Sequence, residues 1–229
     1  LYKKNKPLKL CYYGEVVRKK GSMLRPERQF LQIGAECIGD ESFLADVEIM
    51  ELAYTSLKKV GIKNITIEIS SRIFFDKFLK KINNKDMKDE ITRLIKLKDL
   101  KGLLEILDKK FHEYITGLFK CTGIYKENIK NLKNLGIDKI TSNEVLNIEN
   151  ILRVFTKRNK NINVFLDLCE IDDKNYHTGI RFAFFANNVR GEIARGGRYF
   201  TKLSNMKDIA TGFTCYMDTI LRASSLTLI

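Results

Sequence analysis

The chain has 229 residues, a formal net charge of +13 and a hydrophobic fraction of 44%. This length suffices for one sizeable hydrophobic core, and no apolar run approaches the roughly 20 residues of a membrane span, so we expect a soluble, cytoplasmic protein without membrane contact. The positive charge is mostly lysine dispersed along helical stretches, which is typical of solvated faces and disfavours nucleic acid as a partner.

The cysteines stand far apart and form no closely spaced pair: Cys11, Cys37, Cys121, Cys169 and Cys215. Most of them lie in apolar runs, which is typical of buried free thiols in a reducing compartment. Structural zinc normally takes ligands from closely spaced cysteine pairs, so no metal site is predicted. The sequence indicates no cofactor.

Residues 9–17 and 29–37 predict two antiparallel strands joined by a polar turn. Arg18 ends the first strand, and Gln32 and Glu36 lie four residues apart on the second, so these last two side chains face the same side. An Arg, a Gln and a Glu on one sheet could hold an ammonium and a carboxylate, as in an amino-acid-like ligand. A surface arginine and a solvated polar face explain the same residues without any ligand.

A helix follows this hairpin. Ser42 is its predicted N-cap, apolar residues recur at three- and four-residue spacing, and Gly61 ends it. Residues 65–69 then predict a strand with three isoleucines on one face.

From Arg72 to about Asn159 the periodicity is almost continuously helical, which predicts a helical insertion. Ser142 is the predicted N-cap of its last helix. Apolar stripes of this kind are ordinarily core residues.

Four further strands are predicted at residues 163–169, 176–186, 192–200 and 209–217. Neither group of strands could bury both of its faces alone, so the two groups should combine into one sheet. We therefore expect an α+β fold with an antiparallel sheet flanked by helices. Its parts would be the first half of the core at 1–71, the helical insertion at 72–160 and the second half of the core at 161–229.

Several segments, in this order, resemble the class II aminoacyl-tRNA synthetases, and within them the histidyl line. The strand Gln29-Phe30-Leu31-Gln32-Ile33-Gly34-Ala35-Glu36 is similar to motif 2, and Tyr176-His177-Thr178-Gly179-Ile180-Arg181-Phe182 to the second histidine-pocket strand. Arg195-Gly196-Gly197-Arg198-Tyr199 resembles the glycine-rich turn, and Gly212-Phe213-Thr214-Cys215-Tyr216-Met217-Asp218-Thr219 the closing motif 3. The resemblance covers nearly the whole chain and implies a class II synthetase-like fold.

The resemblance also implies a histidine-like pocket. Its residues would be Arg18, Gln32, Glu36, Tyr176, His177, Thr178, Gly196, Gly197 and Tyr199. Tyr176 and His177 resemble paired aromatic positions that recognise the imidazole, although a lone histidine beside an apolar strand is usually a hydrogen-bonded core residue. Two adjacent glycines would let the backbone approach the ligand, or would simply form a tight turn.

Three charges that the synthetase pattern needs are replaced in this chain. Lys20 stands where the resemblance implies an acidic residue that helps to place ATP, Asp172 where it implies the catalytic arginine, and Thr219 where it implies the motif 3 arginine that holds the phosphates. Because adenylation depends on such electrostatic stabilisation, we expect no adenylation and no catalytic residue in this chain.

A synthetase-like fold that keeps an amino-acid pocket and lacks the ATP-handling arginines resembles the regulatory-subunit family of ATP phosphoribosyltransferase, to which residues 176–192 are particularly similar. The resemblance implies homodimers that join the short-form catalytic subunit in a hetero-oligomer, activate it for the first step of histidine biosynthesis and transmit feedback inhibition by histidine. Two alternatives remain, an active histidyl-tRNA synthetase fragment and an RNA-binding module derived from a synthetase. The replaced charges argue against the first, and the lack of a compact basic patch argues against the second.

The resemblance begins almost at Leu1, in the strand before motif 2, whereas the family carries a dimer-forming segment ahead of that strand. Leu226-Thr227-Leu228-Ile229 would stop within the final helix. We therefore expect an N-terminally truncated fragment that behaves poorly without the preceding segment.

Overall fold

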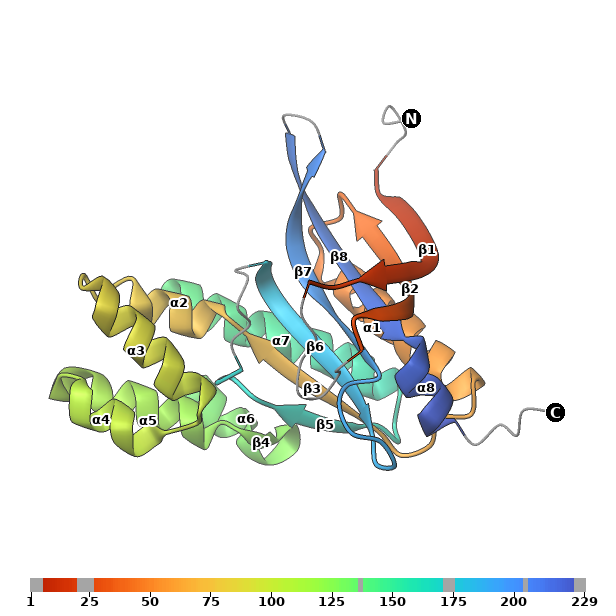
Figure 1. The fold of residues 1–229 in the computed structure, drawn as a ribbon. Helices are drawn as coiled ribbons and strands as arrows, with labels where there is room; N and C mark the ends of the chain where they lie inside the picture. The colour runs from red at the N-terminus through yellow and green to blue at the C-terminus, as the bar shows by residue number, and fades with distance from the viewer. Residues whose placement is uncertain (1–5, 20–26, 136–137, 171–175, 204–205, 225–229) are drawn as a thin grey trace.

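The computed structural model describes residues 6–19, 27–135, 138–170, 176–203 and 206–224. Its sheet has the strand order β1-β2-β8-β7-β6-β3-β5-β4 (Figure 1). The strands are β1 Leu8–Val17, β2 Gln29–Ile38, β3 Ile65–Ser71, β4 Gly123–Ile124, β5 Asn163–Leu166, β6 His177–Ala186, β7 Ala194–Leu203 and β8 Met206–Tyr216. Strands from both predicted groups therefore do form one sheet. Every pairing is antiparallel except that of β3 with β5, which is parallel and was not expected.

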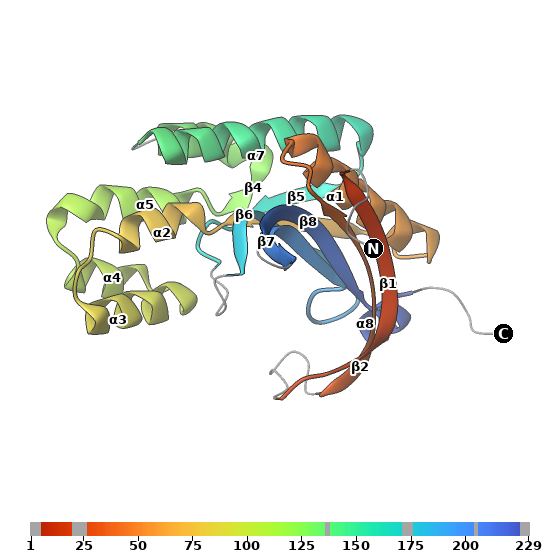
Figure 2. The same cartoon turned by 90° about the horizontal axis from the view of Figure 1, so that it is seen from above.

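The helices fall into two groups. They are α1 Phe43–Lys59, α2 Ile73–Leu79, α3 Lys85–Lys96, α4 Leu100–Ile106, the 3-10 helix η1 Lys109–Phe111, α5 His112–Lys120, α6 Tyr125–Asn134, α7 Lys139–Arg158 and α8 Met217–Ala223. Helices α2 to α5 gather beyond the end of the sheet that lies away from β1 and β2, whereas α7 runs back along the sheet toward α1 (Figures 1 and 2). The range 72–160 is thus almost entirely helical, and its division from the core as a separate unit stays a prediction.

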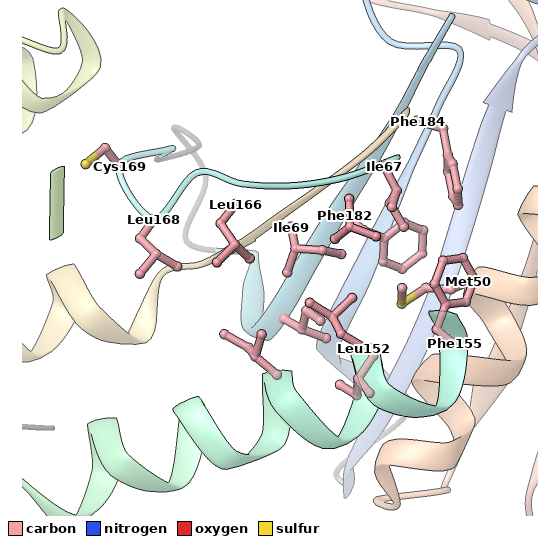
Figure 3. Packing of buried hydrophobic residues seen from close by; sticks show 14 of the residues in the cluster. Met50, Ile67, Ile69, Leu152, Phe155, Leu166, Leu168, Cys169, Phe182 and Phe184 are labelled. Atoms are coloured by element: carbon pink, nitrogen blue, oxygen red, sulfur yellow. The ribbon is translucent and has the colours of Figure 1, made fainter. Parts of the chain in front are cut away.

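The hydrophobic core lies between the sheet and the pair α1 and α7. Met50 of α1 and Phe155 of α7 pack there with side chains of β3 and β6 such as Ile67 and Phe182, and all four are fully buried (Figure 3). Burying one such side chain contributes about 1.5 to 3 kcal/mol. Since successive side chains of a strand point to opposite faces, this packing assigns one face of each strand to the core and leaves the other for the site.

The start of α7 corrects the sequence interpretation. The helix begins at Lys139, and its N-cap is Asp138 instead of Ser142. The Asp138 carboxylate accepts from the backbone N–H groups of Ile140 and Thr141, at 3.0 and 2.9 Å, and the Thr141 hydroxyl accepts from the backbone of Asp138. This capping box uses Thr at the position where Glu or Gln is the usual sequence signature, so the pattern was missed.

The largest differences between predicted and observed strand boundaries are at the end of β5, the end of β7 and the start of β8. Strand β5 ends at Leu166 instead of residue 169, because Asp167 turns the chain and its carboxylate accepts from the backbone N–H of Cys169 at 3.0 Å. Strands β7 and β8 extend beyond the predicted residues 200 and 209 to form a longer hairpin. Among the described helices none is both long and apolar enough to cross a membrane.

Candidate functional site

The sheet face opposite the core carries most of the predicted site residues. Strand register places Glu36 of β2, Gly212 of β8, Gly197 of β7 and Arg181 of β6 directly beside one another in a single row. Residues directly opposite one another on paired strands share a face of the sheet. The row therefore has the acidic side chain of Glu36 at one end, the basic side chain of Arg181 at the other and two glycines between them.

Glu36 lies at the centre of a polar aromatic group that we call the Glu36 cluster: Glu36, Tyr176, His177 and Tyr199. The Tyr199 hydroxyl donates to Oε2 of Glu36 at 2.8 Å, and the Tyr199 ring stacks on that of Tyr176, with centroids 4.7 Å apart and planes at 21°. The ring of His177 meets Tyr176 edge-on at 5.2 Å. The half-buried Glu36 carboxylate thus lies near aromatic residues from two segments that are more than 130 residues away in the sequence, one at 176–177 and one at 199.

Burial raises the pKa of Glu36, while the hydrogen bond from Tyr199 opposes that rise. The pKa values of Tyr176 and Tyr199 are also raised, in both cases chiefly by burial. Both tyrosines are therefore neutral at physiological pH. The cluster can offer one carboxylate as an acceptor, aromatic faces for stacking and hydroxyl groups that donate or accept.

The two glycines of the row leave room that no other residue would leave. A Cβ at Gly212 would lie 1.7 Å from Oε2 of Glu36, so the carboxylate sits directly over this glycine. A Cβ at Gly197 would lie 2.8 Å from Cδ2 of His177, and Gly197 also has a φ of 155°, which L side chains rarely adopt. Both positions therefore require glycine for the cluster to form.

The remaining predicted residues occupy other places. Arg18 is exposed, and its guanidinium carbon lies 4.9 Å from the ring centroid of Phe30. Gln32 is half-buried on the same face as Glu36, four residues away along β2, and Thr178 is exposed at the irregular start of β6.

Gly196 does not belong to the site, which corrects its assignment to the pocket. A Cβ there would lie 2.5 Å from the Phe182 ring, on the core side of the sheet. Successive residues of β7 face opposite sides of the sheet. Because Gly197 faces the Glu36 cluster, its neighbour Gly196 must face the core.

Of the replaced synthetase positions, Lys20 and Asp172 lie outside the described residues. Thr219 lies in the first turn of α8 and is buried, with 2% of its surface exposed. A buried hydroxyl at this position offers no positive charge to a phosphate.

Arg198, one residue before Tyr199, faces the core side and has a structural role. Its Nε and Nη2 donate to the carboxylate of Asp46 at 2.7 to 3.1 Å, and its remaining donors reach the backbone carbonyls of Asp40 and Ser42 at 2.9 and 2.7 Å. The side chains of Arg198 and Asp46 are 8% and 1% exposed. Burial raises the pKa of Asp46, and the facing guanidinium opposes that rise. This pair fixes the start of α1 to β7.

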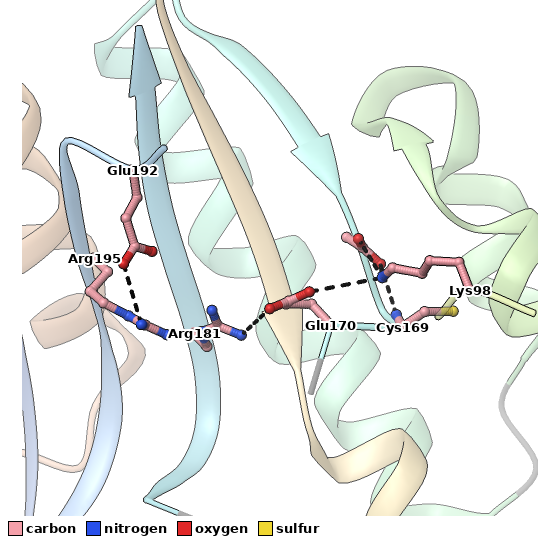
Figure 4. Close-up of polar contacts among 7 residues, drawn as sticks. Lys98, Cys169, Glu170, Arg181, Glu192 and Arg195 are labelled. Atoms are coloured by element: carbon pink, nitrogen blue, oxygen red, sulfur yellow. Dashed lines mark hydrogen bonds and ion pairs between the residues drawn. The ribbon is translucent and has the colours of Figure 1, made fainter. Parts of the chain in front are cut away.

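A second group of charges lies toward the other end of the row (Figure 4). Arg181 Nη1 is 3.3 Å from Oε1 of Glu170, and Lys98, from the helical region, donates to both carboxylate oxygens of Asp167 at 2.8 and 2.7 Å. Glu68 of β3 is near these groups, and burial together with the charges of Asp167 and Glu170 raises its pKa to about 7.

The sequence interpretation missed several residues of this site. Tyr12 and Thr214, whose hydroxyls share a hydrogen bond, flank the Glu36 cluster on β1 and β8, and Arg181 and Gly212 complete the row. Arg181 and Gly212 stand inside motifs that were recognised, so the strand alternation within each motif was the signal that could have found them.

A pocket of about 410 Å³ lies elsewhere, in the helical region. It is lined by Lys77, Phe78, Lys81, Lys110, Phe111, Tyr114 and Asp138. Lys77 and Lys110 already pair with acidic side chains. No group of three or more metal-ligating side chains is found in the described part of the chain.

The chain matches a known protein family over most of its length. The family model described as histidyl-tRNA synthetase matches residues 1–220. The chain belongs to the histidyl-tRNA synthetase family. Within that family it is 29% identical, over 221 residues, to an ATP phosphoribosyltransferase regulatory subunit from Rhodospirillum centenum, covering 96% of this chain and 57% of that relative. The chain thus spans little more than half of that relative's length.

Solved structures show the same fold. A Bacillus halodurans protein described as an ATP phosphoribosyltransferase regulatory subunit/histidyl-tRNA synthetase superposes with a TM-score of 0.82 at 23% identity, covering 97% of this chain and 60% of that one. The ATP phosphoribosyl transferase (HisG:HisZ) complex from Thermotoga maritima superposes with a TM-score of 0.73 at 20% identity, covering 94% and 75%. The predicted class II synthetase-like fold and the resemblance to the regulatory subunits are confirmed.

Proposed function

We propose that this chain is the synthetase-like part of a non-catalytic regulatory subunit of ATP phosphoribosyltransferase. It would assemble with the short-form catalytic subunit, activate it and respond to histidine. The observation that carries the proposal is the Glu36 cluster in a chain whose closely matching relative is named as that regulatory subunit. The fold similarity to a complex with a catalytic partner supports the assembly.

The loss of adenylation is part of this proposal. Thr219 is a buried hydroxyl where the resemblance implies an arginine, and the sequence has Lys20 and Asp172 at two further replaced positions. Losing one contact of this kind can cost a few kcal/mol of transition-state stabilisation. An amino-acid site that binds without reacting suits a sensor of histidine.

We further propose that the chain forms a homodimer. Tyr13 of β1 and Ile33 of β2 are directly paired, and they are 84% and 40% exposed. Cys11 is also exposed and lies on the same side of β1. Exposed apolar side chains gathered on one strand face are typical of an interaction surface.

The test is a phosphoribosyltransferase assay of the protein mixed with its short-form catalytic subunit, with and without histidine. Activity should require the mixture and fall when histidine is added. Glu36→Gln should weaken the response to histidine and keep the activation, whereas Glu48→Gln, which changes an exposed acid on α1, should alter neither. Histidine-dependent pyrophosphate exchange by this protein alone, without any stimulation of the catalytic subunit, would mean an active synthetase.

A further inference from the structure

The Arg181 side chain is buried on the same face of the sheet as the Glu36 cluster. The described contacts do not pair all of its hydrogen-bond donors. Only 9% of its surface is exposed, and its Nη1 pairs with Glu170 at 3.3 Å. Its buried Nε finds no acceptor among the residues that the structure describes. Buried donors in native proteins are nearly always paired, so an acceptor from elsewhere is expected here.

The position of Arg181 relative to Glu36 suggests where that acceptor comes from. Neighbouring strands lie about 4.8 Å apart, so the three strand intervals from β2 to β6 separate the two Cα atoms by roughly 14 Å. The Glu36 side chain already extends over Gly212, which shortens the distance to Arg181. This separation of the two Cα atoms suits a molecule of amino-acid size lying above the glycines.

Charges of both signs lie near Arg181. Arg195 of β7 lies diagonally beside Arg181 on the same face, because it pairs with Ala183, two residues along β6. Glu192 pairs with Arg195 and Glu170 pairs with Arg181 (Figure 4), and the charge of Arg181 also acts on Glu68 of β3. A guanidinium has five N–H donors, and the contact of Nη1 with Glu170 leaves Nε of Arg181 without an acceptor among the described residues.

We propose that Arg181 binds the carboxylate of the ligand held by the Glu36 cluster. The site then takes an intact α-amino acid, with Glu36 accepting from its nitrogen-bearing end and the Nε–H of Arg181 donating to its carboxylate. This inference rests on the proposed function, because it names the ligand groups of the same site. It also gives the site a guanidinium from β6, in a chain that has Asp172 where the resemblance implies an arginine.

Calorimetric titration with L-histidine and with histamine, which lacks the carboxylate, tests the inference. The unsubstituted chain should prefer histidine, and Arg181→Gln should lose about ten- to hundredfold of affinity for histidine while its affinity for histamine stays the same. Arg181→Lys, which keeps the charge and the pairing with Glu170, should lose less. Arg158→Gln is the matched control, because Arg158 pairs with Glu51 between α7 and α1. Circular dichroism confirms that each variant is folded.

A histidine preference that survives in Arg181→Gln would overturn the inference and leave the proposed function standing. If the chain binds neither compound, the proposed response to histidine is wrong. Acetate then tests independently whether Arg181 binds a carboxylate. Acetate should shift the Nε–H signal of Arg181 in a nitrogen-15 NMR spectrum, assigned by its loss in Arg181→Lys. An unmoved signal overturns the inference. The double variant Asp172→Asn, Asp173→Asn is compared with the unsubstituted chain in the absence of acetate. A difference in the Nε–H signal of Arg181 between the two also overturns the inference, because a carboxylate of the chain itself would then be the acceptor of that N–H.

Discussion

The buried pair of Arg198 and Asp46 permits a quantitative prediction. Replacing Arg198 by Met leaves the Asp46 carboxylate, which is 1% exposed, without its three charge-assisted hydrogen bonds. Breaking a buried pair by removing one partner costs about 3 to 5 kcal/mol, which is a large part of the 5 to 15 kcal/mol that typically stabilises a domain. We expect a midpoint of thermal unfolding lower by roughly 6 to 20 °C. Asp46→Ala should cost a similar amount.

Urea denaturation followed by circular dichroism measures these free energies of unfolding. The double variant Asp46→Leu, Arg198→Met should be more stable than the sum of the single losses implies, by about 2 to 4 kcal/mol, since no uncompensated charge remains. The control pair, Arg158 and Glu51, is 59% and 23% exposed, and breaking it should cost less than about 1 kcal/mol. Single variants that lose less than 1 kcal/mol, or losses that simply add, would refute the assignment of a structural role to Arg198.

Three further predictions concern the site's face. Gly212→Ala should displace the Glu36 carboxylate and weaken histidine binding at least about tenfold in calorimetry, whereas Gly14→Ala, where a Cβ meets nothing within 4 Å, should not. Tyr199→Phe should raise the pKa of Glu36 further, as seen in an NMR titration, because the lost hydrogen bond lowers it; an unchanged pKa would contradict the described contact. The folded-state pKa of Glu68, about 7, lies above its ordinary value of 4.5, so the folded state binds more protons between these pH values and stability falls as pH rises through them. Glu68→Gln should therefore raise the free energy of unfolding by about 1 to 3 kcal/mol at pH 8 and leave it unchanged at pH 4, and an equal gain at both pH values would disprove this.

The sequence predicted the elements whose signals are local. Strand β2, helix α1, strand β3 and strand β6 lie close to their predicted positions because period-two or period-3.6 burial and short turns specify them. The start of α7 was missed because Thr141 replaces the usual acid or amide of a capping box. The parallel pairing of β3 with β5 was missed because these strands lie about 100 residues apart, and no pattern within either strand reports its partner.

The candidate site was predicted less completely than the fold. Glu36, Tyr176, His177 and Tyr199 do come together, although their roles in binding remain predictions. Gly196 was included because it stands inside a motif, and motif membership does not say which face of a strand a residue occupies. Arg181 was left out for the same reason, since only the register shows it in line with Glu36.

The adjacency of Arg198 and Tyr199 has a consequence for folding. One residue forms the buried ion pair and the next binds Glu36, on opposite faces of β7. A slip of β7 by one residue would exchange the two faces, placing a tyrosine against Asp46 and a guanidinium beside Glu36. The slipped alignment is therefore unfavourable, because the Asp46 carboxylate would be buried without a charged partner. Helix α1, which makes no described contact in the Glu36 cluster, thereby selects the one alignment of β7 in which the cluster can assemble.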